Sequence, residues 1–321
     1  MGGFLQTLGQ KLAERWLTLL VLPGALFVAT AITAQTLGQA HALDHHRLIE
    51  QVARWVHTPA AAGIGGQVVI LGSILASAAA AGLAAQGLAT LVQRAVLAVG
   101  WNTWPRQLRR GARALVVRRR SRWTAAARRY QQQLDADARA LARTGGRADL
   151  APRRAAYHAM LRIATEEPDR PTWSGDRIHA VTVRLERDHH LDLPALWPYL
   201  WLTVPETTRA EITTAEQALA RAAALGGWAL MYTLLTAWWW PAALLAAAIG
   251  LTARYRIRCA ADTYAQLLEA AARLHATGLA TQLGIDHTGH ADPALGDALT
   301  HQLRAQNPAL SPPSSGGAPL Y

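Results

Sequence analysis

The chain contains almost no cysteine, since Cys259 is the only one in 321 residues. A single cysteine excludes an intramolecular disulfide and any zinc site built from cysteine ligands. Lysine is equally scarce: Lys11 is the only one, and arginine supplies the rest of the 32 Lys and Arg residues. Because the chain is also rich in alanine, GC-rich coding is sufficient to explain this choice, and we assign no function to it.

Charged residues are also few, at 17% of the chain against about 25% in an average soluble protein. Hydrophobic residues make up 51%, and the mean hydropathy is +0.07. The apolar residues are concentrated in four runs without a charged side chain: Trp16–Leu37, Gln67–Val92, Ala222–Trp239 and Trp240–Ala253. The first three have the length of a membrane-spanning helix. The fourth is short unless it continues through Arg254, whose side chain can reach the lipid headgroups.

The absence of charge inside these runs argues against an ion or proton pathway, which membrane proteins build from ionisable residues. A secondary transporter is therefore disfavoured. Ser73, Ser77, Ala81 and Ala85 form a row of small side chains at i, i+4 spacing, a pattern that lets helices pack closely. The chain contains no Ser/His/Asp pattern, nucleophile elbow or metalloprotease motif, so the sequence predicts neither an enzyme nor a cofactor.

The sequence Trp238-Trp239-Trp240-Pro241 separates the third run from the fourth. Indole rings prefer the headgroup layer of a bilayer, so residues 222–253 are predicted to form a hairpin with this turn at the membrane surface. The first run has an alternative interpretation as a cleaved signal peptide, because it has a basic start and small residues at Ala29-Thr30-Ala31. Its length and the Pro23-Gly24 pair in its middle favour a membrane span instead.

Acidic residues are absent from a long basic stretch that begins where the second run ends. Residues 94–129 hold eleven arginines and no acid. Residues 94–170 carry eighteen arginines and six acids, a net charge of +12, whereas the loop 38–66 balances two arginines with two acids. Positively charged loops stay on the cytoplasmic side of the plasma (inner) membrane. We therefore expect four spans, with residues 38–66 outside and both termini and residues 94–221 in the cytoplasm.

The basic stretch predicts contact with the anionic inner leaflet of the lipid bilayer, where each arginine near the surface contributes about 1 kcal/mol. Nucleic acid is disfavoured as a partner because Trp123 and Tyr130 fall on the apolar stripe of the predicted helix, away from the arginines. An acidic protein partner is a further alternative. The residues expected to face lipid are Arg106, Arg109, Arg110, Arg113, Arg118, Arg119 and Arg120.

Hydrophobic residues spaced by three and four predict helices in the rest of the chain, and no segment has the alternation of a strand. The expected helices cover residues 108–141, 152–166, 193–202 and 255–283. Ser174 is a candidate N-cap for a helix that carries Ile178, Val181 and Leu185 on one face. The tail after Asp286 is rich in proline, serine and glycine, and is expected to be disordered.

These patterns predict an all-α integral membrane protein with two transmembrane helical hairpins and a helical cytoplasmic domain. The expected segments are the N-terminus with the first transmembrane helix (1–37), an exterior loop (38–66), the second transmembrane helix (67–93), a basic helical cytoplasmic domain (94–221), a transmembrane hairpin (222–253), a cytoplasmic helix (254–285) and a disordered tail (286–321).

Histidines occur in three small clusters. The first contains His41, Asp44, His45 and His46, the second is His189-His190 with Asp188 and Asp192, and the third contains His287 and His290. None of the clusters has the HExxH spacing or a third ligand at a fixed offset. Structural metal sites usually need four ligands, so solvated polar side chains are the expected role of these residues.

Three segments carry more extended motifs: LAERWLTLLVLPG, PTWSGDRIHAV followed by LDLPALWPYLWLTVPE, and YAQLLEAAARLHATGLATQLGI. They resemble an uncharacterised family of bacterial multi-spanning membrane proteins, mostly actinobacterial. Its members share a Pro-Thr-x-x-Gly-(Asp/Asn) motif, an arginine six residues before Gly-Leu-Asp, and a Trp-Pro-x-Leu-Trp core. Arg184 matches the arginine, whereas His190 replaces the glycine that follows it. The resemblance implies the membrane architecture and brings no activity with it.

The leading functional hypothesis is a non-enzymatic membrane scaffold or adaptor that presents its cytoplasmic domain to an unidentified protein partner. Two indoles are expected to anchor residues 172–206 on neighbouring helices. The residues expected at this partner or packing surface are Asp176, Arg177, Arg184, Trp197 and Trp201. The alternative is an oligomeric pore or membrane-disrupting effector built on the span 67–92. A third class, a lipid- or metal-dependent enzyme, requires a bound metal or cofactor, and a homo-oligomer is compatible with all three.

Overall fold

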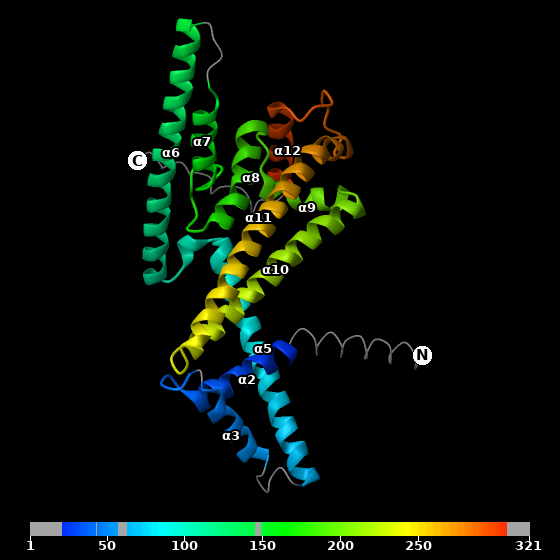
Figure 1. Ribbon diagram of the computed structural model, residues 1–321. Coiled ribbons are helices and arrows are strands. Elements are labelled where there is room, and N and C mark those ends of the chain that lie inside the picture. The colour runs from blue at the N-terminus through cyan, green and yellow to red at the C-terminus, as the bar shows by residue number, and fades with distance from the viewer. Residues whose placement is uncertain (1–20, 43, 57–62, 145–148, 307–321) are drawn as a thin grey trace, which may run out of the picture. The chain divides into compact units, whose positions relative to one another are not determined.

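The computed structural model describes residues 21–42, 44–56, 63–144 and 149–306 (Figure 1). Throughout these ranges the chain is helical and contains no strand, so the all-α prediction is confirmed. The elements in chain order are α2 (Leu22–Leu37), α3 (His45–Val56), α5 (Ile64–Leu97), the 3₁₀ turn η2 (Trp101–Thr103), α6 (Arg106–Thr144), α7 (Ala151–Leu161), α8 (Trp173–His189), α9 (Leu193–Thr203), α10 (Glu206–Leu235), α11 (Pro241–Gln282) and α12 (Pro293–Gln306). Residues 16–20 of the first apolar run lie outside the described ranges.

The chain forms two compact units. Unit 1 consists of Met1–Arg94 and Ala220–Ile257, and unit 2 consists of Ala95–Leu219 and Arg258–Tyr321. The long helices α5, α10 and α11 each contribute residues to both units.

Small residues set the packing of unit 1. The side of α5 that is buried carries Ala78, Ala85 and Ala89, with at most 9% of each residue exposed. A Cβ atom added to Gly227 of α10 would lie 2.5 Å from the carbonyl oxygen of Ala85, so only glycine permits this approach. Of the expected row Ser73, Ser77, Ala81 and Ala85, the last residue makes this contact, whereas both serines are exposed. The spacing of small residues predicts close helix packing, but α5 carries several such rows and the spacing does not decide which row faces another helix.

A turn with tryptophans joins α10 to α11, as the Trp-Trp-Trp-Pro sequence predicted. The Gln39 side chain donates to the carbonyls of Thr236 and Ala237 at 2.9 and 3.1 Å. The Trp239 indole donates to the carbonyl of Ala42 at 2.9 Å. These contacts hold the turn against the residues that follow α2. Pro241 is the first residue of α11, a position that suits proline because a backbone N–H there would have no partner within the helix.

Within the described residues, two helices are long and apolar enough to cross a membrane, judged by length and composition: Gly65–Leu97 and Glu206–Leu235. The apolar helix α2, with 16 residues, is shorter. The fourth apolar run is not a separate element. It is the first part of α11, a continuous helix of 42 residues.

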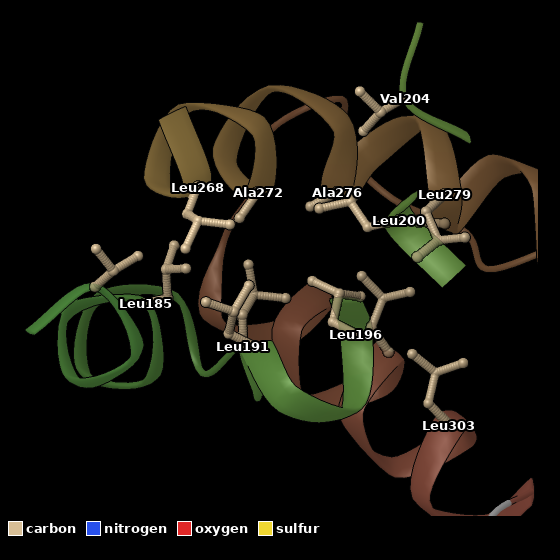
Figure 2. Packing of buried hydrophobic residues seen from close by; sticks show 14 of the residues in the cluster. Leu185, Leu191, Leu196, Leu200, Val204, Leu268, Ala272, Ala276, Leu279 and Leu303 are labelled. Atoms are coloured by element: carbon tan, nitrogen blue, oxygen red, sulfur yellow. The ribbon is translucent and has the colours of Figure 1, made fainter. Parts of the chain in front are cut away.

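The core of unit 2 is built from leucines and alanines of α8, α9, α11 and α12 (Figure 2). Leu185 of α8 and Leu196 and Leu200 of α9 are at most 2% exposed. They pack against the alanine-rich side of α11, including Ala272 and Ala276. The helices α6 and α7 form an antiparallel hairpin beside this core, with the rings of Tyr130 and Tyr157 5.3 Å apart (Figure 1). The helix expected over 108–141 is therefore confirmed as α6, whereas α7 ends earlier than the expected residue 166.

The expected disorder after Asp286 was wrong for residues 293–306, which form α12. Leu295, Leu299 and Leu303 of this helix are at most 4% exposed and belong to the core. Their i, i+4, i+8 spacing makes one apolar stripe, but the proline- and glycine-rich composition around it concealed the helix. Residues 307–321 of the expected tail lie outside the described ranges.

The N-cap of α8 also differs from the prediction. The Thr172 hydroxyl, not that of Ser174, accepts a hydrogen bond from the Gly175 N–H at 3.1 Å. Ser174 lies inside the first turn and is 4% exposed. Thr172 has the extended backbone that is typical of an N-cap.

Candidate functional site

The helices α8 and α11 run in the same direction and pair in one constant register. Four charged or aromatic contacts each join residues that are 85 positions apart in the chain. They are Trp173 with Arg258 (4.3 Å to the ring centroid), Arg177 with Asp262 (2.5 Å), Arg184 with Glu269, and Asp188 with Arg273 (3.9 Å). The steps of four, seven and four along each helix are those of a parallel coiled coil, in which the same face returns every seven residues.

Apolar residues fill the space between these pairs. Val181 and Leu185 on α8 pack in the same cluster as Ala265, Leu268 and Ala272 on α11. Alanine on one helix allows the other to approach closely, which brings the flanking arginines and carboxylates within reach. The Arg184 and Glu269 side chains are 17% and 18% exposed. At that burial, removing one partner leaves the other charge poorly solvated.

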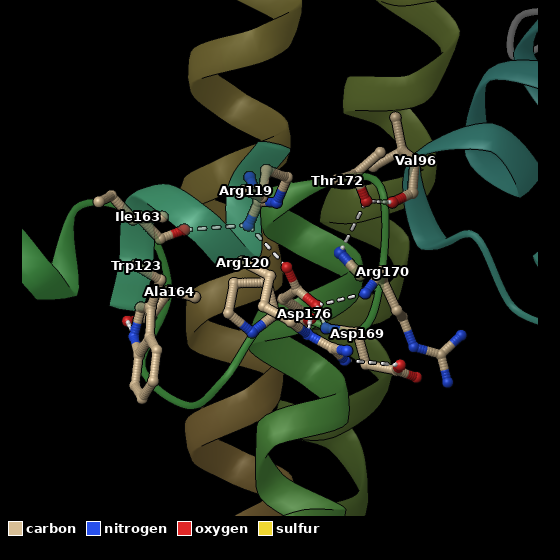
Figure 3. A network of polar contacts seen from close by, with 12 residues as sticks. Val96, Arg119, Arg120, Trp123, Ile163, Ala164, Asp169, Arg170, Thr172 and Asp176 are labelled. Atoms are coloured by element: carbon tan, nitrogen blue, oxygen red, sulfur yellow. Dashed lines mark hydrogen bonds and ion pairs between the residues drawn. The ribbon is translucent and has the colours of Figure 1, made fainter. Parts of the chain in front are cut away.

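A second ionic centre surrounds Asp176 at the start of α8 (Figure 3). This residue is 5% exposed. One carboxylate oxygen accepts from the Arg119 guanidinium at 2.6 Å, and the other accepts from the backbone N–H groups of Asp169 and Arg170 at 2.9 and 2.7 Å. Burial raises the pKa of Asp176, while the N–H groups and Arg119 act in the opposite direction. The centre joins α6, α8 and the loop before α8.

The loop before α8, whose backbone N–H groups bind the Asp176 carboxylate, also caps the C-terminal end of α5. The last carbonyls of a helix have no partner within it and need donors from elsewhere. The Arg170 guanidinium donates to the carbonyl of Ala98 at 2.9 Å. The Thr172 hydroxyl donates to the carbonyl of Val96, as Figure 3 shows. A Cβ atom on Gly175 would lie 2.6 Å from the Leu97 carbonyl oxygen, so glycine is required there. The Pro-Thr-Trp-Ser-Gly-Asp motif is therefore a helix-capping structure.

The basic residues of α6 divide into two groups. Arg119 was expected to face lipid, and this was wrong: its side chain is 20% exposed and donates to both Asp176 and the carbonyl of Ile163. Arg120 forms ion pairs with Glu167 and Asp169, at 2.8 and 3.6 Å, and is about half exposed. The other five expected residues are exposed: Arg106, Arg109, Arg110, Arg113 and Arg118. An unbroken run of arginines in sequence concealed that one of them points into the fold.

The five residues expected at a partner or packing surface fall into two groups. Asp176, Arg177 and Arg184 bind other residues of unit 2, and the first two are buried. Trp197 and Trp201 lie on α9 with their rings 5.8 Å apart and are partly exposed. The partners of these residues were not predicted from the sequence; they are Arg119, Arg170, Asp262, Glu269 and Arg273. One signal was present: Asp262 and Glu269 are seven apart, as are Arg177 and Arg184.

Each of the three histidine clusters contains a side chain that contacts other residues, and in the third cluster His287 Nε2 lies 2.9 Å from the Thr281 hydroxyl. His189 Nδ1 lies 2.8 Å from the carbonyl oxygen of Ala291, and His190 Nδ1 lies 3.1 Å from an Asp297 carboxylate oxygen. In the first cluster, His41 Nδ1 lies 3.3 Å from the Arg47 guanidinium. Among the residues that the structure describes, no three His, Cys, Asp or Glu side chains are grouped closely enough to hold a metal ion.

The carboxylates of this network accept hydrogen bonds from arginines and backbone N–H groups, so their role is to join the helices. Acid–base catalysis requires a carboxylate that can reach a substrate proton, whereas Asp176 is enclosed by its three donors. The network instead fixes the relative positions of α6, α8, α11 and the end of α5 within unit 2. Comparison of the chain with protein-family models, curated proteins and solved structures returns no match.

Proposed function

We propose that the chain is a multi-pass protein of the inner membrane that presents a helical cytoplasmic domain as a non-enzymatic scaffold or adaptor. The observation that carries this proposal is the surface of α5. The most apolar 18-residue window of Gly65–Leu97 has a mean hydropathy of 2.2, and only 17% of it is buried within the chain. The core helix of a water-soluble protein would be mostly buried.

Large aliphatic side chains cover the exposed part of α5. They are Val68, Val69, Ile70, Leu71, Ile74, Leu75, Leu83 and Leu91, each at least 42% exposed. Water-soluble proteins rarely leave an apolar patch of this extent uncovered. A bilayer core about 30 Å thick would cover it, since roughly 20 helical residues span that distance.

The proposed topology contains two hairpins. The first joins α2 to α5 through residues 38–66 on the outside, and the second joins α10 to α11 through the turn at Trp238–Trp240. The residues that follow α5 are basic and those of the 38–66 loop are balanced in charge, so the positive-inside rule keeps both termini and α6 in the cytoplasm. The exposed arginines at the start of α6 would then meet anionic headgroups of the inner leaflet.

The adaptor role rests on how the domain is attached. Arg170 and Thr172 cap the last carbonyls of α5 directly, and Arg170 and Asp169 in turn donate to Asp176. The last residues of α5 are thus part of the helical domain instead of a free linker. Such a domain would be held at the membrane surface, where an unidentified cytoplasmic protein partner could bind it.

Cysteine accessibility tests the topology. Cysteines are introduced singly at Ala60, Ala148 and Ser315 in a Cys259→Ala background, and intact cells are treated with a membrane-impermeant thiol reagent. Only the Ala60 position should react, because the charge-balanced loop 38–66 is the segment expected outside, whereas the basic residues after α5 keep the rest in the cytoplasm. Reaction at Ala148 would invert the topology, and reaction at both Ala60 and Ser315 would mean an odd number of spans. Permeabilised cells, in which all three positions should react, provide the control.

A further inference from the structure

The outer face of α9 is apolar and free of charge, with its prolines and Leu202 exposed and its two tryptophans half-buried. This helix has the sequence LPALWPYLWLT, and its inner face places Leu193, Leu196 and Leu200 in the core. The opposite face consists of Pro194, Trp197, Pro198, Trp201 and Leu202, and Pro205 follows it. Leu202 is 75% exposed, and the three prolines are also exposed. A helix that is apolar on every side is normally buried on every side, so this face lacks its cover.

We propose that the C-terminal segment of this same chain, residues 307–321, binds the exposed face of α9. The chemistry of the two surfaces matches. The segment NPALSPPSSGGAPLY contains four prolines and no charged side chain, and α9 offers two indoles and two prolines without a charge. Grooves lined by aromatic residues are the usual binding sites for proline-rich segments, whose stiff backbone loses little entropy on binding.

The position where α12 ends supports this choice of occupant. Arg304, in the last turn of α12, donates to the Asp192 carboxylate from Nε at 3.0 Å and from Nη2 at 2.5 Å. Asp192 is itself the N-cap of α9, where its side chain accepts from the Ala195 N–H. Leu303 packs in the same cluster as Leu196 and Leu200. The last turn of α12 therefore contacts the helix that the following segment is proposed to cover.

The length of the segment is sufficient. Fifteen residues reach about 45 Å at the ~3.1 Å per residue of an extended proline-rich chain. The eleven residues of α9 span about 17 Å at 1.5 Å per residue. The segment can therefore cross the whole face without disturbing α12, and this proposal concerns the helical domain whether or not the chain spans a membrane.

Disulfide cross-linking in the full-length chain tests the proposal. In a Cys259→Ala background, Ser311→Cys is combined with either Leu202→Cys on α9 or Leu274→Cys on α11. Leu274 is the matched control because it is 74% exposed, against 75% for Leu202. The purified protein is oxidised under mild conditions, and the cross-linked fraction is followed over time by mass spectrometry. We expect the Leu202→Cys pair to cross-link at least tenfold faster, and Pro312→Ser with Pro313→Ser to remove that difference.

Two results overturn the proposal. Equal rates at Leu202→Cys and Leu274→Cys would show that the segment has no preference for α9. Cross-linked dimers that form in proportion to protein concentration would show that a second copy supplies the segment. Both cysteine positions are exposed on the helix surface, so circular dichroism and gel filtration should confirm an unchanged fold before the rates are compared.

Discussion

Neighbouring arginines of unit 2 make different contacts, although they look equivalent in the sequence. Arg119 lies in the same arginine triplet as Arg118 and Arg120, yet it points to the buried carboxylate of Asp176 at 2.6 Å. Arg118 is exposed. A position 100° further around a helix changes an arginine from a solvated charge into the partner of a buried carboxylate. The function of each arginine therefore depends on its helix face.

The ion pair between Arg184 and Glu269 should be a major source of stability. Glu269→Gln removes the negative charge that both Arg184 and Arg273 contact, and we expect a loss of about 2 kcal/mol, below the 3–5 kcal/mol of fully buried pairs because some solvent reaches the site. The matched control is Glu206→Gln, whose side chain is 84% exposed beside Arg209 and should cost less than about 0.5 kcal/mol. Thermal unfolding of the detergent-solubilised chain, followed by circular dichroism, measures both. A similar change in the two variants would show that the pair is not stabilising.

His179 should make stability depend on pH. Burial, with the nearby charge of Arg170, lowers the pKa of His179 below the ordinary value of 6.5. The unfolded chain therefore takes up this proton first, and stability should decline as the pH falls through 6.5. Asp169, 4.0 Å away, opposes the shift. Unfolding midpoints of the wild type and His179→Gln, compared between pH 8 and pH 5.5, isolate the effect. Parallel curves for the two proteins would contradict it.

Among the helices, α12 shows how a short amphipathic segment becomes part of a core. Its three leucines enter the space left by α8, α9 and α11, and its polar residues fix it from the outside. The Thr300 hydroxyl donates to the carbonyl of His190, and Asp297 contacts the same histidine. Gly296 allows the close approach, because a Cβ atom there would lie 1.8 Å from the His189 carbonyl oxygen. A helix of 14 residues is marginal in isolation and depends on such contacts.

Replacing Leu299, which is fully buried, should therefore release α12. Leu299→Ala should cost about 2–5 kcal/mol, the usual range for a large core residue, and should raise the rate of proteolysis in the segment 283–292 before the helix. Leu274→Ala, at a position that is 74% exposed, serves as the control and should leave the rate unchanged. Limited proteolysis with mass spectrometry locates the cuts. Equal resistance of both variants would mean that α12 contributes little to the core.

The molecule as a whole combines two kinds of packing. Unit 1 is held by glycine and alanine contacts and by aromatic rings such as Phe27 with Tyr232, 5.4 Å apart. Unit 2 combines a leucine core with ion pairs and helix caps. Small-residue contacts are typical where lipid is the solvent, because burial of apolar groups then provides no driving force between helices. Unit 2 also contains close small-residue contacts, at Gly175 and Gly296, so its buried ion pairs and helix caps are what distinguish it from unit 1.

The adaptor proposal and the pore alternative predict opposite behaviour in liposomes. The exposed side chains of α5 between Val68 and Leu91 are largely aliphatic and none is charged, so a ring of these helices would offer few groups to stabilise water or ions. We expect liposomes that contain the purified chain to retain a trapped dye as well as protein-free liposomes do. Release that increases with the protein-to-lipid ratio would favour a pore.

Local patterns in the sequence were sufficient to predict most of the long helices, whereas α12 was expected to be disordered. Steps of three and four residues indicated α6, and the Trp-Trp-Trp-Pro sequence indicated the turn between α10 and α11, because both depend on residues close together in the chain. The pairing of Arg177 with Asp262 and of Arg184 with Glu269 could not be predicted, since it joins residues 85 positions apart. The inward orientation of Arg119 and the burial of α12 were missed for the same reason. A side chain's partner is set by which helix faces meet, and that depends on the packing of the whole domain.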